Sequence, residues 1–291
     1  MSKRRWGDRR DAVLVRDIDA MHNYMTYLMP NRTEAEVCQI DTYDVTELLK
    51  YIEAKNGPDA EFKTTIFHAL VMAMAKVIYM RPLLNRYISA NRFYDRREIS
   101  FSFVAKKRFT DHAEEALMIL KPKEGETLTD ISRQIVGKVH EARKEGENYG
   151  ADDILKLVQK LPRFVMHLVI ALLNFLDRHG WLPGFVTDVD PNFTTVLLSN
   201  LGSIKCNACY HHLNNFGTNS IMVNIGTIHK EPMVMEDGSV QVRDVVSIAA
   251  IADERIADGF YFARSLKIVR FLFEHPEWLD RPLEDVPELK L

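Results

Sequence analysis

The chain has 291 residues, of which 46% are apolar and 27% charged, and its formal net charge is -3 at pH 7. This length allows one large domain or two small ones, and the apolar content allows a substantial core. The near-neutral charge argues against a nucleic-acid-binding protein. Three cysteines are too few for a secreted disulfide framework. No signal peptide, lipidation motif or membrane span is predicted, which favours the cytoplasm.

The first half of the chain mixes strand and helix patterns. Residues 37–49 alternate and then turn helical, which predicts a strand followed by a helix capped by Asp44 or Thr46. Apolar residues at helical spacing predict a buried or amphipathic helix within 62–80, ended by Pro82. Strands are predicted at 92–94, 99–105 and 116–120, and a surface helix at 128–144.

The second half begins with a polar loop, predicted at 146–153, and with the most apolar stretch of the sequence, 164–176. This stretch is too short to span a bilayer, so we expect a core helix or one that lines an apolar channel. Strands and a final helix are predicted at 193–198, 220–228, 240–251 and 259–274, with an Asp-Gly hairpin turn at 236–239. Strands and helices alternate along the chain without a strict βαβ order, which predicts an α/β fold with a mixed sheet.

The clearest functional signal lies near the C-terminus, in Asp253-Glu254-Arg255-Ile256-Ala257-Asp258-Gly259. It resembles the His-x-x-x-Asp-Gly active-site signature of chloramphenicol acetyltransferases and of the dihydrolipoyl acyltransferase cores of 2-oxoacid dehydrogenase complexes, with Glu254 in place of the histidine. Residues 43–49 (YDVTELL) and 195–202 (TVLLSNLG) resemble two further segments of that family. The similarity covers most of residues 37–275 in the family's order.

The resemblance implies a two-layer α/β sandwich with a mixed sheet, the coenzyme A-dependent acyltransferase fold of chloramphenicol acetyltransferase. It also implies a homotrimer with an active site at each subunit interface. A coenzyme A thioester is then the donor substrate, a small molecule with a thiol, hydroxyl or amine is the acceptor, and no tightly bound cofactor is expected. Residues 37–291 are assigned to one catalytic domain. Residues 1–36 are assigned to an N-terminal extension, too short for a lipoyl or subunit-binding domain.

The resemblance also assigns roles to individual residues. Ser199 matches the serine that donates a hydrogen bond to the tetrahedral oxyanion, although a serine at the end of a buried strand also has a plain structural role. Asp258 matches the aspartate that holds the catalytic loop through an arginine near the N-terminus, for which Arg16 is the candidate. Gly259 is expected to allow a tight turn into the final helix.

Glu254 stands where that family has its catalytic base. A free glutamate has a pKa near ~4.3, some two units below histidine, and burial beside apolar groups raises a carboxyl group to about 6 to 7. Three interpretations stay open. Glu254 is the base of an altered acyltransferase; another histidine has taken over; or the site is a remnant, used for binding or assembly by a catalytically silent scaffold or acyl-CoA-binding subunit.

A second cluster follows the Ser199 segment, where Cys206, Cys209, His211 and His212 fall within seven residues. His211 or His212 is the alternative base, if it reaches the site of a neighbouring subunit. The cluster also has the residue types of a zinc site. Such sites usually draw their second ligand pair from a more distant segment, so no metal is assigned. The simplest expectation is a polar loop whose histidines form local hydrogen bonds.

Other histidines and one segment carry weaker expectations. His68 and His167 lie on apolar helical faces and are expected to be satisfied core histidines, while His229, at a strand end, is a minor candidate base. The apolar segment 161–181 is expected to line a pocket for a hydrophobic acceptor or acyl group, provided that a cavity lies beside it.

Overall fold

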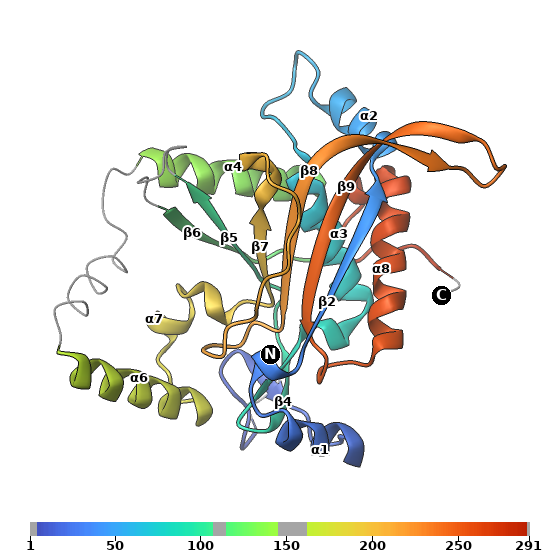
Figure 1. The fold of residues 1–291 in the computed structure, drawn as a ribbon. Helices are drawn as coiled ribbons and strands as arrows, with labels where there is room; N and C mark the ends of the chain where they lie inside the picture. Colours follow the sequence, from blue (N-terminus) through green and yellow to red (C-terminus); the bar gives the residue numbers. More distant parts are fainter. Residues whose placement is uncertain (1–4, 107–114, 145–161, 290–291) are drawn as a thin grey trace.

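Figure 1 shows the computed structural model, which describes residues 5–106, 115–144 and 162–289, as a layer of helices against a mixed sheet. The sheet has the strand order β2-β9-β8-β7-β5-β6. Strand β7 runs parallel to β5 and β8, and the other neighbours are antiparallel. The strands are Glu36–Asp44 (β2), Phe101–Lys106 (β5), Glu115–Leu120 (β6), Val196–Asn200 (β7), Ile221–Val234 (β8) and Val240–Asp253 (β9). The predicted α/β class and mixed sheet are confirmed.

A second, smaller sheet includes residues that were expected to form an N-terminal extension. Its antiparallel strands have the order β1-β4-β3 and comprise Ala12–Leu14 (β1), Arg86–Ser89 (β3) and Arg92–Arg96 (β4). Helix α1 (Ala20–Leu28) follows β1, and a 3-10 turn at Arg32–Glu34 leads into β2. The N-terminal segment thus packs into the fold from β1 onward.

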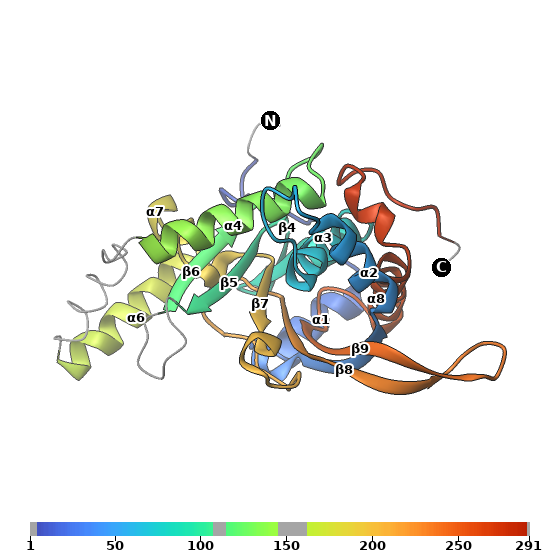
Figure 2. The same ribbon diagram turned by 90° about the horizontal axis from the view of Figure 1, so that it is seen from above.

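The helices α2 (Thr46–Lys55), α3 (Ile66–Met80), α4 (Leu128–Lys144) and α8 (Gly259–Glu274) cover one face of the large sheet (Figures 1 and 2). Helix α3 is buried along almost its whole length, because the sheet, α4 and α8 surround it. The N-cap of α2 is Val45, not Asp44 or Thr46 as predicted. The Asp44 carboxylate instead accepts hydrogen bonds from the Thr46 N–H and hydroxyl, at 2.9 and 2.6 Å.

Strands β8 and β9 form a long hairpin whose tip projects beyond the sheet (Figure 1). The predicted Asp-Gly turn is confirmed: Gly238 adopts φ +81°, in the left-handed region that favours glycine, and the Met235 N–H donates to the Ser239 carbonyl at 2.8 Å. A bulge between Ile225 and Ile228 shifts the register in the middle of the hairpin. This bulge lies next to the segment that follows β7.

Helix α6 (Arg163–Arg178) forms as predicted, but the expectation that it lies in the core is wrong. Figures 1 and 2 place it at the periphery, far from α3 and α8. Phe164 and Leu168 are 74% and 69% exposed, and His167, expected in the core, is exposed as well. In the part of the chain that the structure describes, no helix has the length and apolar content to cross a bilayer. The predicted loop at 146–153 lies outside the described residues.

Two ionisable side chains are buried on α3. His68 is buried as predicted but not satisfied, because its Nδ1 atom has no hydrogen-bond partner among the described residues, and burial lowers its pKa to about 4. The Lys76 amine donates to the carbonyl oxygens of Pro282 and Asp285, each at 2.6 Å. Burial lowers the pKa of Lys76 to about 8. This amine holds the C-terminal segment against α3.

Replacing His68 with leucine is expected to reduce acid sensitivity. The unfolded chain protonates this histidine below pH 6.5, whereas the folded chain resists until about pH 4, so wild-type stability falls as the pH drops through that window. The loss approaches about 2 kcal/mol near pH 5. Urea unfolding at neutral and mildly acidic pH measures it, with the exposed His229→Leu as control. If the wild type and His68→Leu lost the same unfolding free energy on acidification, His68 would not be the source of the acid sensitivity.

Candidate active site

The loop 253–258 joins β9 to α8 and is anchored by a buried ion pair. The Arg255 guanidinium donates to both carboxylate oxygens of Asp253, at 2.7 and 2.6 Å, and to the Met29 carbonyl at 2.6 Å. Asp253 and Arg255 are 0% and 3% exposed. The Glu254 N–H donates to the Ala35 carbonyl at 2.8 Å, while the Glu254 side chain is exposed and makes no hydrogen bond or ion pair with a described residue. The loop is fixed and this carboxylate is left free.

The residues expected to support the loop do not make the contacts that were predicted. Asp258 is the N-cap of α8, where its carboxylate accepts a hydrogen bond from the Tyr261 N–H at 2.7 Å. Arg16 donates to the carbonyl oxygens of Trp6 and Leu14 and to the Asp8 carboxylate, and the described chain shows no contact between Arg16 and Asp258. Gly259 is the first residue of α8, its φ is not positive, and a Cβ there would meet no atom within 4 Å.

Ser199 lies on the opposite side of the sheet from the helices. Val196 and Leu198 point into the main core beneath the helices, so Ser199, between them in the alternation, faces the other way. Its register partner on β8 is Asn224, which is fully buried. The Asn224 side-chain amide donates to the Cys209 carbonyl at 3.0 Å, and its Oδ1 atom has no partner among the described residues. Sequence reasoning missed Asn224, since a lone asparagine in a β-rich segment gives no signal.

The register separates Ser199 from Glu254 within one chain. Ser199 lies beside Asn224, and Asn224 lies opposite Ala249 on β9. Glu254 follows Ala249 by five residues, or roughly 16 Å along the strand, and β9 is two strands from β7, about 10 Å across the sheet. A single chain therefore does not bring the two side chains together.

The segment after β7 packs tightly against the bulge of β8. A Cβ on Gly202 would lie 2.4 Å from the Gly226 carbonyl oxygen, and a Cβ on Gly226 would lie 2.5 Å from the Ala208 nitrogen. Both positions therefore require glycine because of close backbone approach. This contact fixes the chain directly after Ser199 and Asn200.

The cysteine–histidine segment is an exposed loop. His211 Nδ1 lies 3.0 Å from the His212 carbonyl oxygen, and His212 Nδ1 lies 3.2 Å from the Leu213 carbonyl oxygen, which confirms the local hydrogen bonds expected of these histidines. Cys206 and Cys209 are exposed free thiols. Within the described residues, no group of three or more histidine, cysteine, aspartate or glutamate side chains is placed to hold a metal ion.

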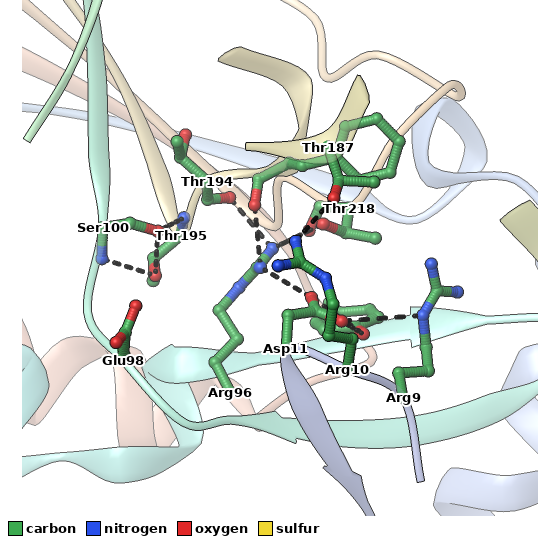
Figure 3. A network of polar contacts seen from close by, with 12 residues as sticks. Arg9, Arg10, Asp11, Arg96, Glu98, Ser100, Thr187, Thr194, Thr195 and Thr218 are labelled. Carbon is green, nitrogen blue, oxygen red and sulfur yellow. Dashed lines mark hydrogen bonds and ion pairs between the residues drawn. The ribbon is translucent and has the colours of Figure 1, made fainter. Parts of the chain in front are cut away.

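Buried arginines position the strands that carry Ser199 and Asn224. Arg96 donates to the carbonyl oxygens of Phe193, Thr194 and Thr218 at 2.9, 2.9 and 2.7 Å, at the entrances to β7 and β8 (Figure 3). Ser100 and Thr195 bind each other beside it, with the Thr195 N–H donating to the Ser100 hydroxyl at 3.0 Å. Burial lowers the pKa of Arg96. The arginine N–H groups donate hydrogen bonds to carbonyl oxygens that have no partner in a neighbouring strand. They take the place that water would otherwise fill.

Two further arginines extend this network. Arg9 donates to the Asp177 carboxylate at 2.5 Å and to the Ser89 hydroxyl at 3.0 Å, which fixes the C-terminal end of α6 against β3. Arg32 donates to the Gly217 carbonyl at 2.6 Å and to the Asn214 carbonyl at 2.9 Å. Burial lowers the pKa of Arg32 to about 10, against the opposing attraction of Asp253. Arg32 therefore holds the loop before β8 against the 3-10 turn that leads into β2.

Known acyltransferase structures share this fold, and a family model matches part of the sequence. The sequence model of the 2-oxoacid dehydrogenases acyltransferase (catalytic domain) matches residues 188–279, which include Ser199, Glu254 and Asp258. No curated protein sequence matches the chain. A probable dihydrolipoamide acetyltransferase from Listeria monocytogenes has a similar structure, with a TM-score of 0.61, 16% identity, and coverage of 90% of this chain and 94% of that one.

Two other solved structures are similar. The dihydrolipoamide acetyltransferase of Azotobacter vinelandii has a TM-score of 0.58 and 16% identity over 89% of this chain and 91% of that one. A chloramphenicol acetyltransferase has a TM-score of 0.56 and 11% identity over 90% of this chain and 99% of that one. The chain has the fold of the 2-oxoacid dehydrogenase acyltransferase catalytic domain. The family resemblance predicted from the motifs is confirmed.

Substitutions at two neighbouring residues, Arg255 and Glu254, are expected to change the unfolding free energy by very different amounts, because the first side chain is buried and the second is exposed. Arg255→Met leaves the Asp253 carboxylate buried without its partner, and this is expected to cost about 3–5 kcal/mol of unfolding free energy. Glu254→Gln changes an exposed side chain and is expected to stay within about 0.5 kcal/mol of wild type. Chemical denaturation of both variants checks this. Similar stability of the two would show that the ion pair does not hold the loop.

The glycine contact beneath Ser199 gives a second stability prediction. Gly202→Ala forces a Cβ against the Gly226 carbonyl and is expected to cost about 1–3 kcal/mol. Gly137→Ala, in α4 with open space around the new Cβ, is the matched control and is expected to stabilise the chain by up to about 1 kcal/mol. Thermal unfolding distinguishes them, and a neutral Gly202→Ala would refute the close approach.

Proposed function

We propose that the chain is a cytoplasmic, coenzyme A-dependent acyltransferase whose catalytic base is Glu254. The observation that supports this most is the contrast within the 253–258 loop. Asp253 and Arg255 are buried and paired with each other, whereas the side chain of Glu254 between them is exposed and has no partner among the described residues. A carboxylate held on a fixed loop, and not neutralised by a neighbouring cation, is available for proton transfer.

The distance between Ser199 and Glu254 supports catalysis between two copies of the chain. Acyl transfer needs the base and the oxyanion donor within about 3 Å of the same reacting group. One chain separates these side chains by more than 10 Å along and across the sheet. The proposal therefore requires an oligomer, a homotrimer by resemblance, in which Ser199 of one subunit faces Glu254 of the next.

In this arrangement Glu254 takes the proton from the thiol, hydroxyl or amine of the acceptor as it attacks the thioester carbonyl carbon. The carbonyl oxygen gains negative charge, and the Ser199 hydroxyl donates a hydrogen bond to it. The C–S bond then breaks, and the coenzyme A thiolate leaves and recovers the proton from Glu254.

A comparison of spacing supports the assignment of both residues. In the Azotobacter vinelandii enzyme, the roles of a serine, a histidine and an asparagine in the catalytic mechanism have been studied, and the asparagine lies four residues after the histidine. Glu254 and Asp258 have the same separation. Asp258 caps α8, so in this chain its side chain fixes the start of the helix behind Glu254.

Thiol release from acetyl-, hexanoyl- and octanoyl-coenzyme A, followed alongside calorimetric binding, tests the proposal. Glu254→Gln is expected to lower turnover by about a hundredfold to ten-thousandfold, and Ser199→Ala by about a hundredfold or more. Glu254→His is expected to keep the turnover that Glu254→Gln loses, because it places an imidazole base on the loop. The matched controls are Glu274→Gln and Ser239→Ala, which change exposed residues away from the site.

Three outcomes would contradict the proposal. Thioester binding with no thiol release under any acceptor favours an acyl-coenzyme A-binding subunit. No binding in the wild type and in Glu254→His favours a silent scaffold that has kept the acyltransferase fold. Retained turnover in Glu254→Gln together with its loss in His211→Ala or His212→Ala would transfer the role of base to that histidine.

A further inference from the structure

An apolar cavity of about 140 Å³ lies between the large sheet and the helices α3 and α8. Strands β2, β8 and β9 form its floor, and one face of α8, from Gly259 through Phe262 and Leu266 to Val269, forms its wall. Ten residues of helix span about 15 Å, so this volume is spread over a long and narrow space. No residue of α6 lines it, so the predicted pocket beside segment 161–181 is not this one.

The cavity exists because small residues stand where larger ones would fill it. Ala250 and Ala252 on β9 and Gly259 and Ser265 on α8 line the space, and a Cβ on Gly259 would meet nothing within 4 Å. Protein interiors are close-packed, and an unfilled void weakens a fold in proportion to its volume. An engineered apolar cavity of about 150 Å³ stays dry and binds a six-carbon hydrocarbon.

The position of the cavity connects it to the Glu254 loop. Ala252 and Gly259, which flank residues 253–258 on both sides, line one end, together with Val37 on the edge strand β2. The cavity then follows β2 to Tyr43, past Gln39 and Asp41, whose side chains bind each other at 3.2 Å. Most of its lining is aliphatic. A ligand that enters beside Glu254 would therefore extend an apolar chain away from the loop.

We propose that this cavity binds the unbranched aliphatic chain of a medium-length acyl group, with about six to eight carbons. The narrow shape favours a linear chain over a ring, and the aliphatic lining favours a hydrocarbon over a polar group. The inference rests on the proposed acyltransferase function, since it places the thioester at the Glu254 end. It assigns a substrate class to that function: medium-chain acyl thioesters in preference to acetyl.

Calorimetry with acetyl-, butyryl-, hexanoyl-, octanoyl- and dodecanoyl-coenzyme A tests this preference on the wild-type chain. Each buried methylene is expected to tighten binding roughly fourfold, so hexanoyl, with four more methylenes, binds about 250-fold tighter than acetyl. The gain is expected to stop beyond about eight carbons, where the cavity is full. Free octanoate, which lacks coenzyme A, is the second probe and is expected to compete with octanoyl-coenzyme A for the cavity.

Ala252→Phe fills the loop end of the cavity and is expected to abolish the chain-length preference and octanoate binding. Val240→Phe, on the exposed hairpin, adds the same ring outside the cavity and is expected to behave as wild type. The wild-type series needs no variant, so the proposal stays testable even if Ala252→Phe does not fold.

The possible results distinguish a failure of the acyl-chain cavity from a failure of the proposed acyltransferase activity. Equal affinity for all thioesters with no octanoate binding overturns the acyl cavity, while thiol release in the same samples leaves the acyltransferase intact. Octanoate binding that Ala252→Phe abolishes, without any thiol release, supports the aliphatic site and contradicts the acyltransferase.

Discussion

The buried ion pair between Asp253 and Arg255 is the interaction on which the rest of the site depends. It closes the end of β9, a strand that is paired on both edges, at the point where the chain turns into α8. The same guanidinium binds the Met29 carbonyl just after α1, so it joins the N-terminal segment to the C-terminal helix. A buried charge pair of this kind adds little net stability, but losing one partner is costly. The loop is therefore fixed in one conformation.

Local patterns were enough to predict most of the fold. The periodicity of α3, the alternation in β8 and β9 and the Asp-Gly turn each predicted the correct element, because neighbours in sequence also decide those structures. Helix α6 was assigned to the wrong environment. Its apolar periodicity is the same whether a helix is covered or exposed, and only the arrangement of distant elements decides which. The buried donors Arg32, Arg96 and Lys76 were missed for a related reason: their acceptors are carbonyl groups of distant segments.

The site was predictable in its residue types and less so in its contacts. The motif that contains Glu254 and Asp258 lies in the loop between β9 and α8, and the Ser199 segment forms β7, two strands from β9 in the sheet. The sequence did not reveal that Asp258 caps a helix or that Arg16 lies beside Asp8. Nor did it reveal the separation of Ser199 from Glu254, which depends on the strand order. Residues that act together in such a site need not meet within one chain, so distance in a monomer is a poor guide to shared function.

The two buried bases on α3 have a consequence for the range of pH in which the molecule is most stable. Below pH 6.5 His68 favours the unfolded chain, and between about pH 8 and 10.5 a rise in pH favours folding, because the unfolded chain still holds the Lys76 proton and the folded chain has released it. Burial raises the pKa of Tyr43 and Tyr87, so above pH 10 the unfolded chain ionises first and folding is disfavoured again. Taken together, the ionisations of these four groups favour folding most on the alkaline side of neutrality.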